Sequence, residues 1–337
     1  MDSDGLADVL LAEALLRARD GIVGTAHLTG DAPGAPTLDQ GERLARMSAD
    51  YREAVLIAEI FEDLSFETDQ PEDAPVADAA RWLRRGDDGP ILLAGFHPPS
   101  AEDFRNAIPL VGGYADLRDD RMAEILVQTQ DLIPFFATLQ PLEPERCRRI
   151  HEMLEVAMSV ATMAVMRIKL ALGCPRPDQF SSRIQPLVDM PAHGAFPSGH
   201  ATQSFLLAGL LTLLNDPGAR LNADSQMFRM ASRIAVNRTV AGVHYPADSA
   251  AGAMLGVALA RYLAARGGGQ KAGGVRMDGR QWAQGGQTRD FHLGEFARMM
   301  AGDDPAVRFT AANPVRPAPL WGWLWSQARR ERNERWS

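Results

Sequence analysis

Three short clusters between residues 169 and 248 organise this sequence. They are KLALGCPRP at 169–177, FPSGHA at 196–201 and NRTVAGVHYPAD at 237–248. Together they hold three fixed cations, a glycine-bearing turn before an expected helix, two histidines and one carboxylate. Such a set is suited to holding a tetrahedral oxyanion and doing chemistry on it.

The first cluster brings two cations together across the end of a helix. Lys169 is expected on the helix, and Arg176 follows the break at Gly173 in an extended conformation, because a proline comes next. Of the 35 basic residues only Lys169 and Lys271 are lysines, so the ammonium at 169 is an exception in an arginine-rich chain. An ordinary solvated helix end is the alternative interpretation.

The second cluster predicts an anion cradle at the start of a helix. Backbone N–H groups there point outward, Gly199 allows close approach, and Ser198 adds a hydroxyl donor. His200 would lie at the mouth of this cradle. The alternative is a serine-capped helix with an incidental histidine.

The third cluster places a histidine and a carboxylate one helical turn apart. Arg238 and His244 are six positions apart and cannot share one face of a straight helix, but Gly242 offers a break between them. Asp248 can then fix the tautomer of His244 and support a positive charge on it. A capped helix with a buried histidine is the alternative.

Together the spacings Lys-x6-Arg-Pro, Pro-Ser-Gly-His and Arg-x5-His-x3-Asp resemble the type 2 phosphatidic acid phosphatase / vanadium haloperoxidase superfamily. The resemblance covers residues 169–248. The third motif of the phosphatases usually opens Ser-Arg, whereas here it opens with Asn237. The resemblance implies an all-α fold, a helical bundle of the vanadium haloperoxidase / acid phosphatase type.

The resemblance also implies a role for each motif residue. His244 would be the nucleophile toward phosphorus or the axial ligand of vanadium, Asp248 would orient it, and His200 would be the general acid/base. The groups that would hold the oxygens of phosphate or vanadate are Lys169, Arg176, Ser198, the Gly199 N–H and Arg238.

The resemblance leaves two activities open, and we expect a vanadate-dependent haloperoxidase that oxidises halide with hydrogen peroxide. The apparent lack of membrane spans and of a signal peptide favours it. His193 favours it too, because it lies seven residues before His200, where the resemblance implies that bromoperoxidases also carry a histidine. The Tyr-Pro-Ala-Asp at 245–248 and the short chain favour the alternative, a soluble phosphatase that hydrolyses phosphomonoesters through a phospho-histidine and needs no cofactor. A non-catalytic phosphate-binding protein is the second alternative.

Composition limits the remaining possibilities. A net charge of -8 argues against nucleic acid as a partner. Apolar runs of about ten residues fall short of the roughly 20 that a membrane span needs, and two cysteines indicate no disulfide framework. We therefore expect a cytoplasmic protein, with a homodimer possible.

The apolar periodicity predicts helices and no convincing strand. We expect an N-terminal helical layer at 1–104, a helical core at 105–265, and a Gly-rich linker with a C-terminal extension at 266–337. Three tryptophans at 321, 323 and 325 are expected to anchor this extension on the core or on a partner subunit. The helices are expected over 6–20, 42–66, 79–85, 119–137, 143–172, 201–214, 225–240 and 246–265, with loops at 29–36, 70–77 and 86–113 and glycine-rich links at 267–274 and 285–286.

Overall fold

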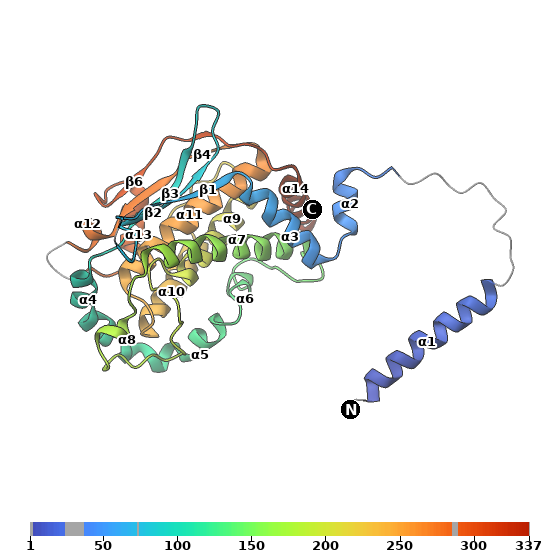
Figure 1. Cartoon of the computed structure of the whole chain (residues 1–337), viewed down its shortest axis with the longest axis horizontal. Coiled ribbons are helices and arrows are strands. Elements are labelled where there is room, and N and C mark those ends of the chain that lie inside the picture. The colour runs from blue at the N-terminus through green and yellow to red at the C-terminus, as the bar shows by residue number, and fades with distance from the viewer. Residues whose placement is uncertain (1–2, 24–36, 73, 285–288, 337) are drawn as a thin grey trace. The chain divides into compact units, whose positions relative to one another are not determined.

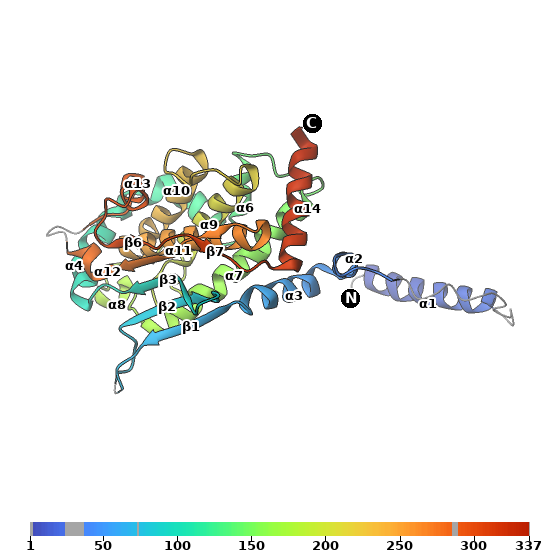
Figure 2. The same cartoon turned by 90° about the horizontal axis from the view of Figure 1, so that it is seen from above.

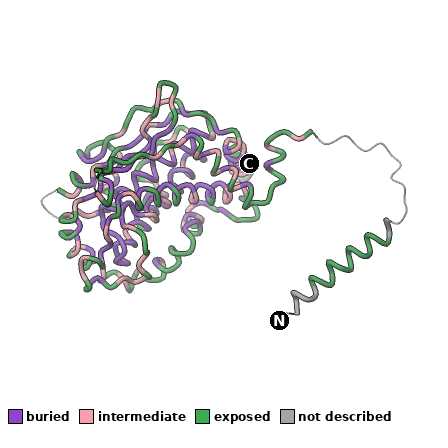
Figure 3. Tube along the Cα trace, viewed as in Figure 1, coloured by how far each residue is buried: buried purple, intermediate pink, exposed green. Residues whose placement is uncertain are grey.

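The computed structural model describes residues 3–23, 37–72, 74–284 and 289–336. The chain divides into two compact units, Met1–Asp39 and Gln40–Ser337. The first contains α1 (Ser3–Val23), which confirms the helix expected over 6–20. Its side chains are exposed throughout residues 8–21 (Figure 3). The loop expected at 29–36 and the glycine pair at 285–286 lie outside the described residues.

The second unit is mainly helical and carries all three clusters (Figure 1). Its helices are α2 (Gln40–Arg46), α3 (Ala49–Phe61), α4 (Ala101–Gly113), η1 (Tyr114–Leu117), α5 (Arg118–Gln128), α6 (Ile133–Ala137), α7 (Arg148–Leu172), α8 (Pro177–Phe180), α9 (Gly199–Asn215), α10 (Gln226–Val240), α11 (Pro246–Gly268), α12 (Gly279–Ala283), α13 (Leu293–Ala301) and α14 (Pro319–Trp336).

Helix α11 is the centre of this unit. It is buried on every side over residues 246–260, as expected of a helix rich in alanine and glycine that is covered all round (Figure 3). The small side chains let α9 approach closely, and a Cβ added to Gly252 would lie 2.6 Å from the Ser198 carbonyl oxygen. This contact holds the start of α9, and with it the second cluster, against α11.

The all-α prediction is wrong in part, because the second unit also contains strands. They are β1 (Leu64–Asp69), β2 (Ala79–Arg84), β3 (Ile91–His97), β4 (Lys271–Ala272), β5 (Val275–Asp278), β6 (Val307–Phe309) and β7 (Asn313–Pro314). Five form one sheet in the order β1-β2-β3-β5-β6, and β4 pairs with β7. The sheet lies along one side of the helices (Figure 2).

Residues 79–85 were expected to form a short helix, and the structure corrects this to strand β2. The strand lies between β1 and β3 in the sheet, so five of its six residues are buried and no alternation of polar and apolar residues marks it. Trp82 faces α7 and its Nε1 donates to the Ala164 carbonyl oxygen at 3.1 Å. Packing against neighbouring strands and α7 therefore makes residues 79–84 a strand. The pattern of polar and apolar residues in this segment does not show it.

The sheet joins the two ends of the second unit. Strand β3 pairs in parallel with β5, with Ala94 opposite Val275 and His97 opposite Asp278, and β5 pairs antiparallel with β6. The region expected as a linker and extension therefore supplies strands to the same sheet as residues 64–97.

Helix boundaries follow the expectations more closely near the clusters. Helices α9, α10 and α11 confirm those expected over 201–214, 225–240 and 246–265. Elsewhere two expected helices are divided. The helix expected over 42–66 is replaced by α2, α3 and β1, and the helix expected over 119–137 by α5 and α6. A helix also occupies 101–113, where a loop was expected.

Helix α7 begins at Arg148, five residues later than expected. It ends at Gly173, whose φ of 55° is the left-handed conformation of a glycine C-cap. Among the described residues, one stretch, Arg148–Phe180, is apolar and long enough to cross a bilayer, with a mean hydropathy of 1.5, and half of its apolar window is buried in the protein. The expected absence of a membrane span therefore stays a prediction.

The tryptophans of α14 pack on the core. Trp321 is fully buried, and its Nε1 donates to the Leu263 carbonyl oxygen of α11 at 2.8 Å. Trp325 is also buried, and Trp323 is partly buried with Arg149 of α7 over its ring. Of the two anchoring surfaces considered from the sequence, the structure shows the core.

Candidate active site

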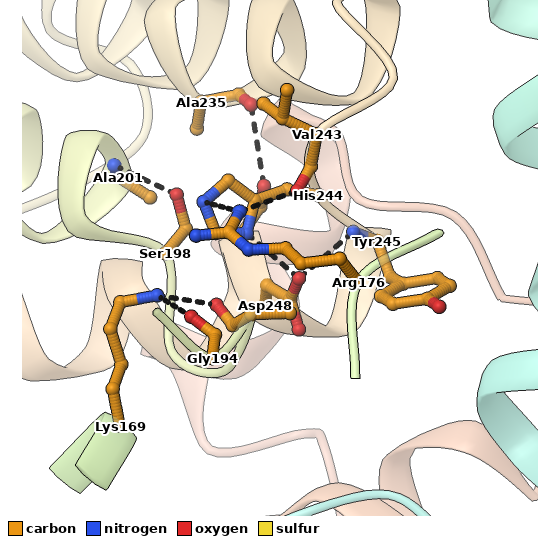
Figure 4. A network of polar contacts seen from close by, with 12 residues as sticks. Lys169, Arg176, Gly194, Ser198, Ala201, Ala235, Val243, His244, Tyr245 and Asp248 are labelled. Atoms are coloured by element: carbon orange, nitrogen blue, oxygen red, sulfur yellow. Dashed lines mark hydrogen bonds and ion pairs between the residues drawn. The ribbon is translucent and has the colours of Figure 1, made fainter. Parts of the chain in front are cut away.

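Lys169 lies in the last turn of α7 and is almost completely buried, at 2% exposure. Its Nζ donates to the carbonyl oxygens of Gly194 and Ala195 at 2.6 and 2.8 Å (Figure 4). Burial, and then the neighbouring Arg176 guanidinium, lower the pKa of the Lys169 ammonium. An anion that enters beside Lys169 would therefore stabilise the charged form of its ammonium.

Arg176 follows the left-handed turn and is held by its neighbours on both sides. Its Nε donates to the His193 carbonyl oxygen at 3.0 Å, and Nη1 donates to the Val243 carbonyl oxygen at 2.6 Å. Nη1 also lies 3.2 Å from His244 Nε2, and Nη2 lies 3.1 Å from His193 Nδ1. The guanidinium thus links the first cluster to the third and has little freedom to move.

The second cluster forms the start of α9. Ser198 is fully buried and its Oγ accepts from the Ala201 N–H at 3.3 Å, so in this structure its hydroxyl serves as the helix cap. A Cβ added to Gly199 would meet no atom within 4 Å, so its surroundings are open. Gly199 and His200 also line a cavity, so an anion can approach the start of α9 there.

His200 is the second residue of α9 and is neutral at ordinary pH. Its Nε2 lies 3.1 Å from the Gln128 carbonyl oxygen, which can only accept, so the ring proton is on Nε2. Burial, and then the positive charge of Arg238, lower the pKa of His200 to about 3. Only Nδ1 is left to exchange a proton with a ligand.

Arg238 is held from behind by the end of α5. Its Nη2 donates to the Ile125 carbonyl oxygen at 3.2 Å and to Gln128 Oε1 at 3.0 Å. Both acceptors are neutral, so the guanidinium keeps its full charge for a ligand. Burial lowers the pKa of Arg238 to about 10, which leaves it charged over the physiological range.

His244 and Asp248 form a buried pair. His244 Nδ1 lies 2.8 Å from Asp248 Oδ2, and the same oxygen accepts from the Tyr245 N–H at 2.9 Å (Figure 4). A proton on Nδ1 leaves the Nε2 lone pair facing Arg176. Burial, followed by the charges of Arg176 and Lys169, lowers the pKa of His244 well below its ordinary value, so Nε2 is unprotonated and accepts from Arg176 Nη1 at 3.2 Å.

These groups surround one cavity of about 910 Å³. Its polar wall is formed by Lys169, Arg176, His193, Gly199, His200, Arg238 and His244. The rest of the lining is mixed. Its apolar side chains are Leu126, Val165, Met166, Pro186, Leu187, Val188, Met190, Pro191 and Val243, and its polar ones are Thr129, Thr162, Asp189 and Gln203. Nearly all the site residues predicted from the sequence thus meet at one place, with Ser198 and Asp248 directly behind it.

Comparison with known protein families fits this geometry. The model of the PAP2 superfamily matches residues 153–267, which include every residue of the three clusters. This part of the chain is similar to the PAP2 superfamily.

Comparisons over the whole chain are less informative. A search of curated proteins finds no match. Among solved structures, the crystal structure titled as that of the first bacterial vanadium-dependent iodoperoxidase is similar over 32% of this chain and 30% of the other, with 21% identity and a TM-score of 0.27. The matched part is thus less than a third of that protein.

The sequence pointed to the residues at the cavity but missed the residues that hold those side chains in place. Gln128 and Ile125 hold Arg238 from a helix some 110 residues earlier, and Val243 holds Arg176 through its backbone. No short motif marks these contacts, because two are made by main-chain carbonyls. The catalytic and binding roles of the cluster residues remain predictions.

The histidines of the PAP2 site give a first testable expectation. The folded pKa of His200, about 3, is below the ordinary value of about 6.5 for an unfolded chain, so the unfolded state binds more protons between these pH values. The free energy of unfolding should therefore fall as the pH drops from about 6.5 toward 3. The His200→Gln variant should show a smaller fall.

Urea denaturation of both proteins at pH 4, 5 and 7 measures this difference. Asp248, whose pKa burial raises, acts in the opposite sense but is present in both proteins and cancels in the comparison. Equal pH dependence in the two proteins would contradict a neutral, buried His200.

Proposed function

We propose that this protein is a phosphatase that hydrolyses phosphomonoesters with an apolar organic group, by nucleophilic attack from His244. The observation that carries the proposal is the cavity, whose lining combines the cations and the unprotonated Nε2 of His244 with nine apolar side chains. Its volume is within the range of about 300–1,000 Å³ typical of pockets that hold drug-sized ligands. A halide ion and a peroxide molecule need no apolar side chains around them. The organic group of an ester is stabilised by such side chains.

The site's geometry supports a two-step reaction. Lys169, Arg176, Arg238 and the α9 N–H groups would hold the phosphoryl oxygens and stabilise the charge that they gain in the transition state. The Nε2 lone pair of His244 would attack phosphorus while the bond to the ester oxygen breaks. Asp248 stabilises the positive imidazole that results, because its Oδ2 accepts from Nδ1.

His200 would supply and recover the proton. With a pKa of about 3 it carries no spare proton until the negative charge of the substrate enters and raises that pKa. It then protonates the leaving ester oxygen through Nδ1. In the second step neutral His200 takes a proton from the water that attacks the phospho-histidine, which releases phosphate and restores His244.

Vanadate-dependent halide oxidation is the second candidate, and His193 favours it. His193 Nδ1 lies 3.1 Å from Arg176 Nη2 and 3.2 Å from the Gly194 carbonyl oxygen, and the ring lines the cavity beside the cations. The same cations and His244 Nε2 fit vanadate, an oxyanion that needs positive charge and a single ring nitrogen. When bound, vanadate would supply the activation of peroxide toward halide.

Parallel assays separate the candidates. Purified protein without vanadate should hydrolyse alkyl phosphomonoesters, and kcat/KM should rise with chain length, since each buried CH₂ contributes about 0.8 kcal/mol. Vanadate should inhibit this reaction. In His193→Ala, hydrolysis should fall less than halide oxidation does, because this ring serves the hydrolytic steps only through its 3.1 Å contact with Arg176.

The other outcomes are equally clear. Halide oxidation with vanadate and peroxide, lost in His193→Ala, together with no ester hydrolysis, would replace the proposal with the haloperoxidase. Tight phosphate binding with neither activity would favour a non-catalytic binding protein.

A further inference from the structure

The last turn of α5 supports two different groups of the site at once. The Ile125 carbonyl oxygen accepts from Arg238, and the Gln128 carbonyl oxygen accepts from His200. Both carbonyls belong to the final turn of α5, where oxygens lack an intrahelical partner and the helix dipole favours positive charge. The side chain of Gln128, which is 2% exposed, adds a third contact, to Arg238.

The orientation of the Gln128 amide is fixed by a chain of contacts that begins at charged groups. Arg121 Nη1, which can only donate, lies 3.2 Å from Asn237 Oδ1, and Glu124 Oε2, which accepts, lies 3.1 Å from Asn237 Nδ2. Asn237 Nδ2 also donates to Gln128 Oε1 at 3.1 Å. Oε1 therefore faces two donors, Asn237 and Arg238, and a flipped amide would bring N–H groups against both.

The identity of this acceptor matters for the charge of the site. Glu124 lies one turn before Gln128, but its carboxylate is occupied by Arg233, whose Nε donates to it at 2.8 Å, and by Asn237. Asn237 thus stands between the nearest carboxylate of α5 and Arg238. The guanidinium is positioned by an amide oxygen and a backbone oxygen, neither of which neutralises it.

We propose that Gln128 is a positioning residue, which aims Arg238 at the bound oxyanion without reducing its charge and sets the proton-bearing nitrogen of His200 from the same turn. Asn237, which departs from the usual serine of the motif, sets the amide of Gln128. The proposal shares with the proposed function the premise that Arg238 binds an oxyanion, and it does not require that the protein hydrolyse an ester.

Two substitutions of Gln128 distinguish positioning from a merely structural role. Gln128→Glu keeps an acceptor of the same shape but pairs the guanidinium with a carboxylate. Gln128→Met keeps the length and removes the acceptor. Gln128→Glu should be the more stable variant, because it retains its contacts with Arg238 and Asn237. Gln128→Met should bind inorganic phosphate more tightly, because the Arg238 guanidinium keeps its charge.

Isothermal titration with inorganic phosphate, beside thermal melting, measures both quantities. From the usual strength of hydrogen bonds to charged groups, we expect the Kd to rise on the order of tenfold in Gln128→Met and a hundredfold in Gln128→Glu. Gln140→Met and Gln140→Glu are matched controls, because Gln140 is also buried and accepts through Oε1, from Asn215 at 2.9 Å, away from the cavity. These controls should bind phosphate as the wild type does.

Each remaining outcome decides the proposal. The proposal is overturned if the variant with the lower melting temperature is also the variant with the weaker phosphate affinity. It is also overturned if both variants bind phosphate as the wild type does. If Gln128→Met does not fold, the comparison of Gln128→Glu with Gln140→Glu decides. Binding is measured without turnover, so an absence of hydrolysis counts against the proposed function alone, whereas a wild type that binds neither phosphate nor orthovanadate overturns both.

Discussion

His244→Ala is expected to abolish turnover, with a loss of at least about 10⁴-fold in kcat, the scale seen when an enzyme loses its nucleophile. The substitution removes the Nε2 lone pair that would attack phosphorus in the proposed reaction and that lies 3.2 Å from Arg176 Nη1. The three cations remain, so inorganic phosphate should still bind. Single-turnover kinetics measure the effect, together with detection of a phospho-enzyme after an alkaline detergent quench, which preserves the acid-labile phospho-histidine. His97→Ala is a control outside the cavity.

Asp248→Asn tests the partner of this histidine. The amide oxygen can keep both contacts that Oδ2 makes, with His244 and with the Tyr245 N–H, while the second carboxylate oxygen has no hydrogen-bond partner among the described residues. The substitution therefore removes mainly the negative charge. We expect a smaller loss, roughly 10- to 100-fold. A phospho-enzyme that still forms in His244→Ala would rule out the assignment of the nucleophile.

Lys169→Arg is expected to lose nearly as much activity as Lys169→Ala, on the order of 10²-fold or more. The ammonium is buried and aimed between the carbonyl oxygens of Gly194 and Ala195, where a planar guanidinium does not fit without displacing the loop. The charge is conserved and the geometry is not. Steady-state kinetics and phosphate titration measure the loss.

Lys271→Arg provides the matched control, because Lys271 is the other lysine of the chain and is exposed. It should retain wild-type activity. If Lys169→Arg keeps more than about a tenth of the activity, a positive charge alone suffices at this position. The compact geometry of the ammonium is then not needed.

The site was predictable because its groups are encoded by short, contiguous segments. A glycine C-cap, a serine-capped helix start, and a histidine one turn before a carboxylate each follow from local chemistry. Gln128 was not predictable, since its contact with Arg238 depends on how α5 packs against α10. A glutamine in an amphipathic helix carries no sign of such a contact.

The strands were missed for a related reason. Strand β2 is buried almost continuously, and β5 and β6 are four and three residues long, too short for a period-2 pattern to appear. The single helix expected over 119–137 is divided into α5 and α6. The Asp131 side chain caps α6 there through the Ile133 N–H at 2.9 Å, a contact that requires the chain to have turned already.

The mixed sheet has a consequence for how the chain is made. When residues 64–97 leave the ribosome, β1, β2 and β3 can pair with one another, but the outer edge of β3 waits for β5, about 180 residues later. At typical synthesis rates of about 5–20 residues per second this interval is on the order of ten to forty seconds. A nascent chain thus presents an open strand edge while the helices that carry the three clusters are made, and the emergence of β5 from the ribosome closes it.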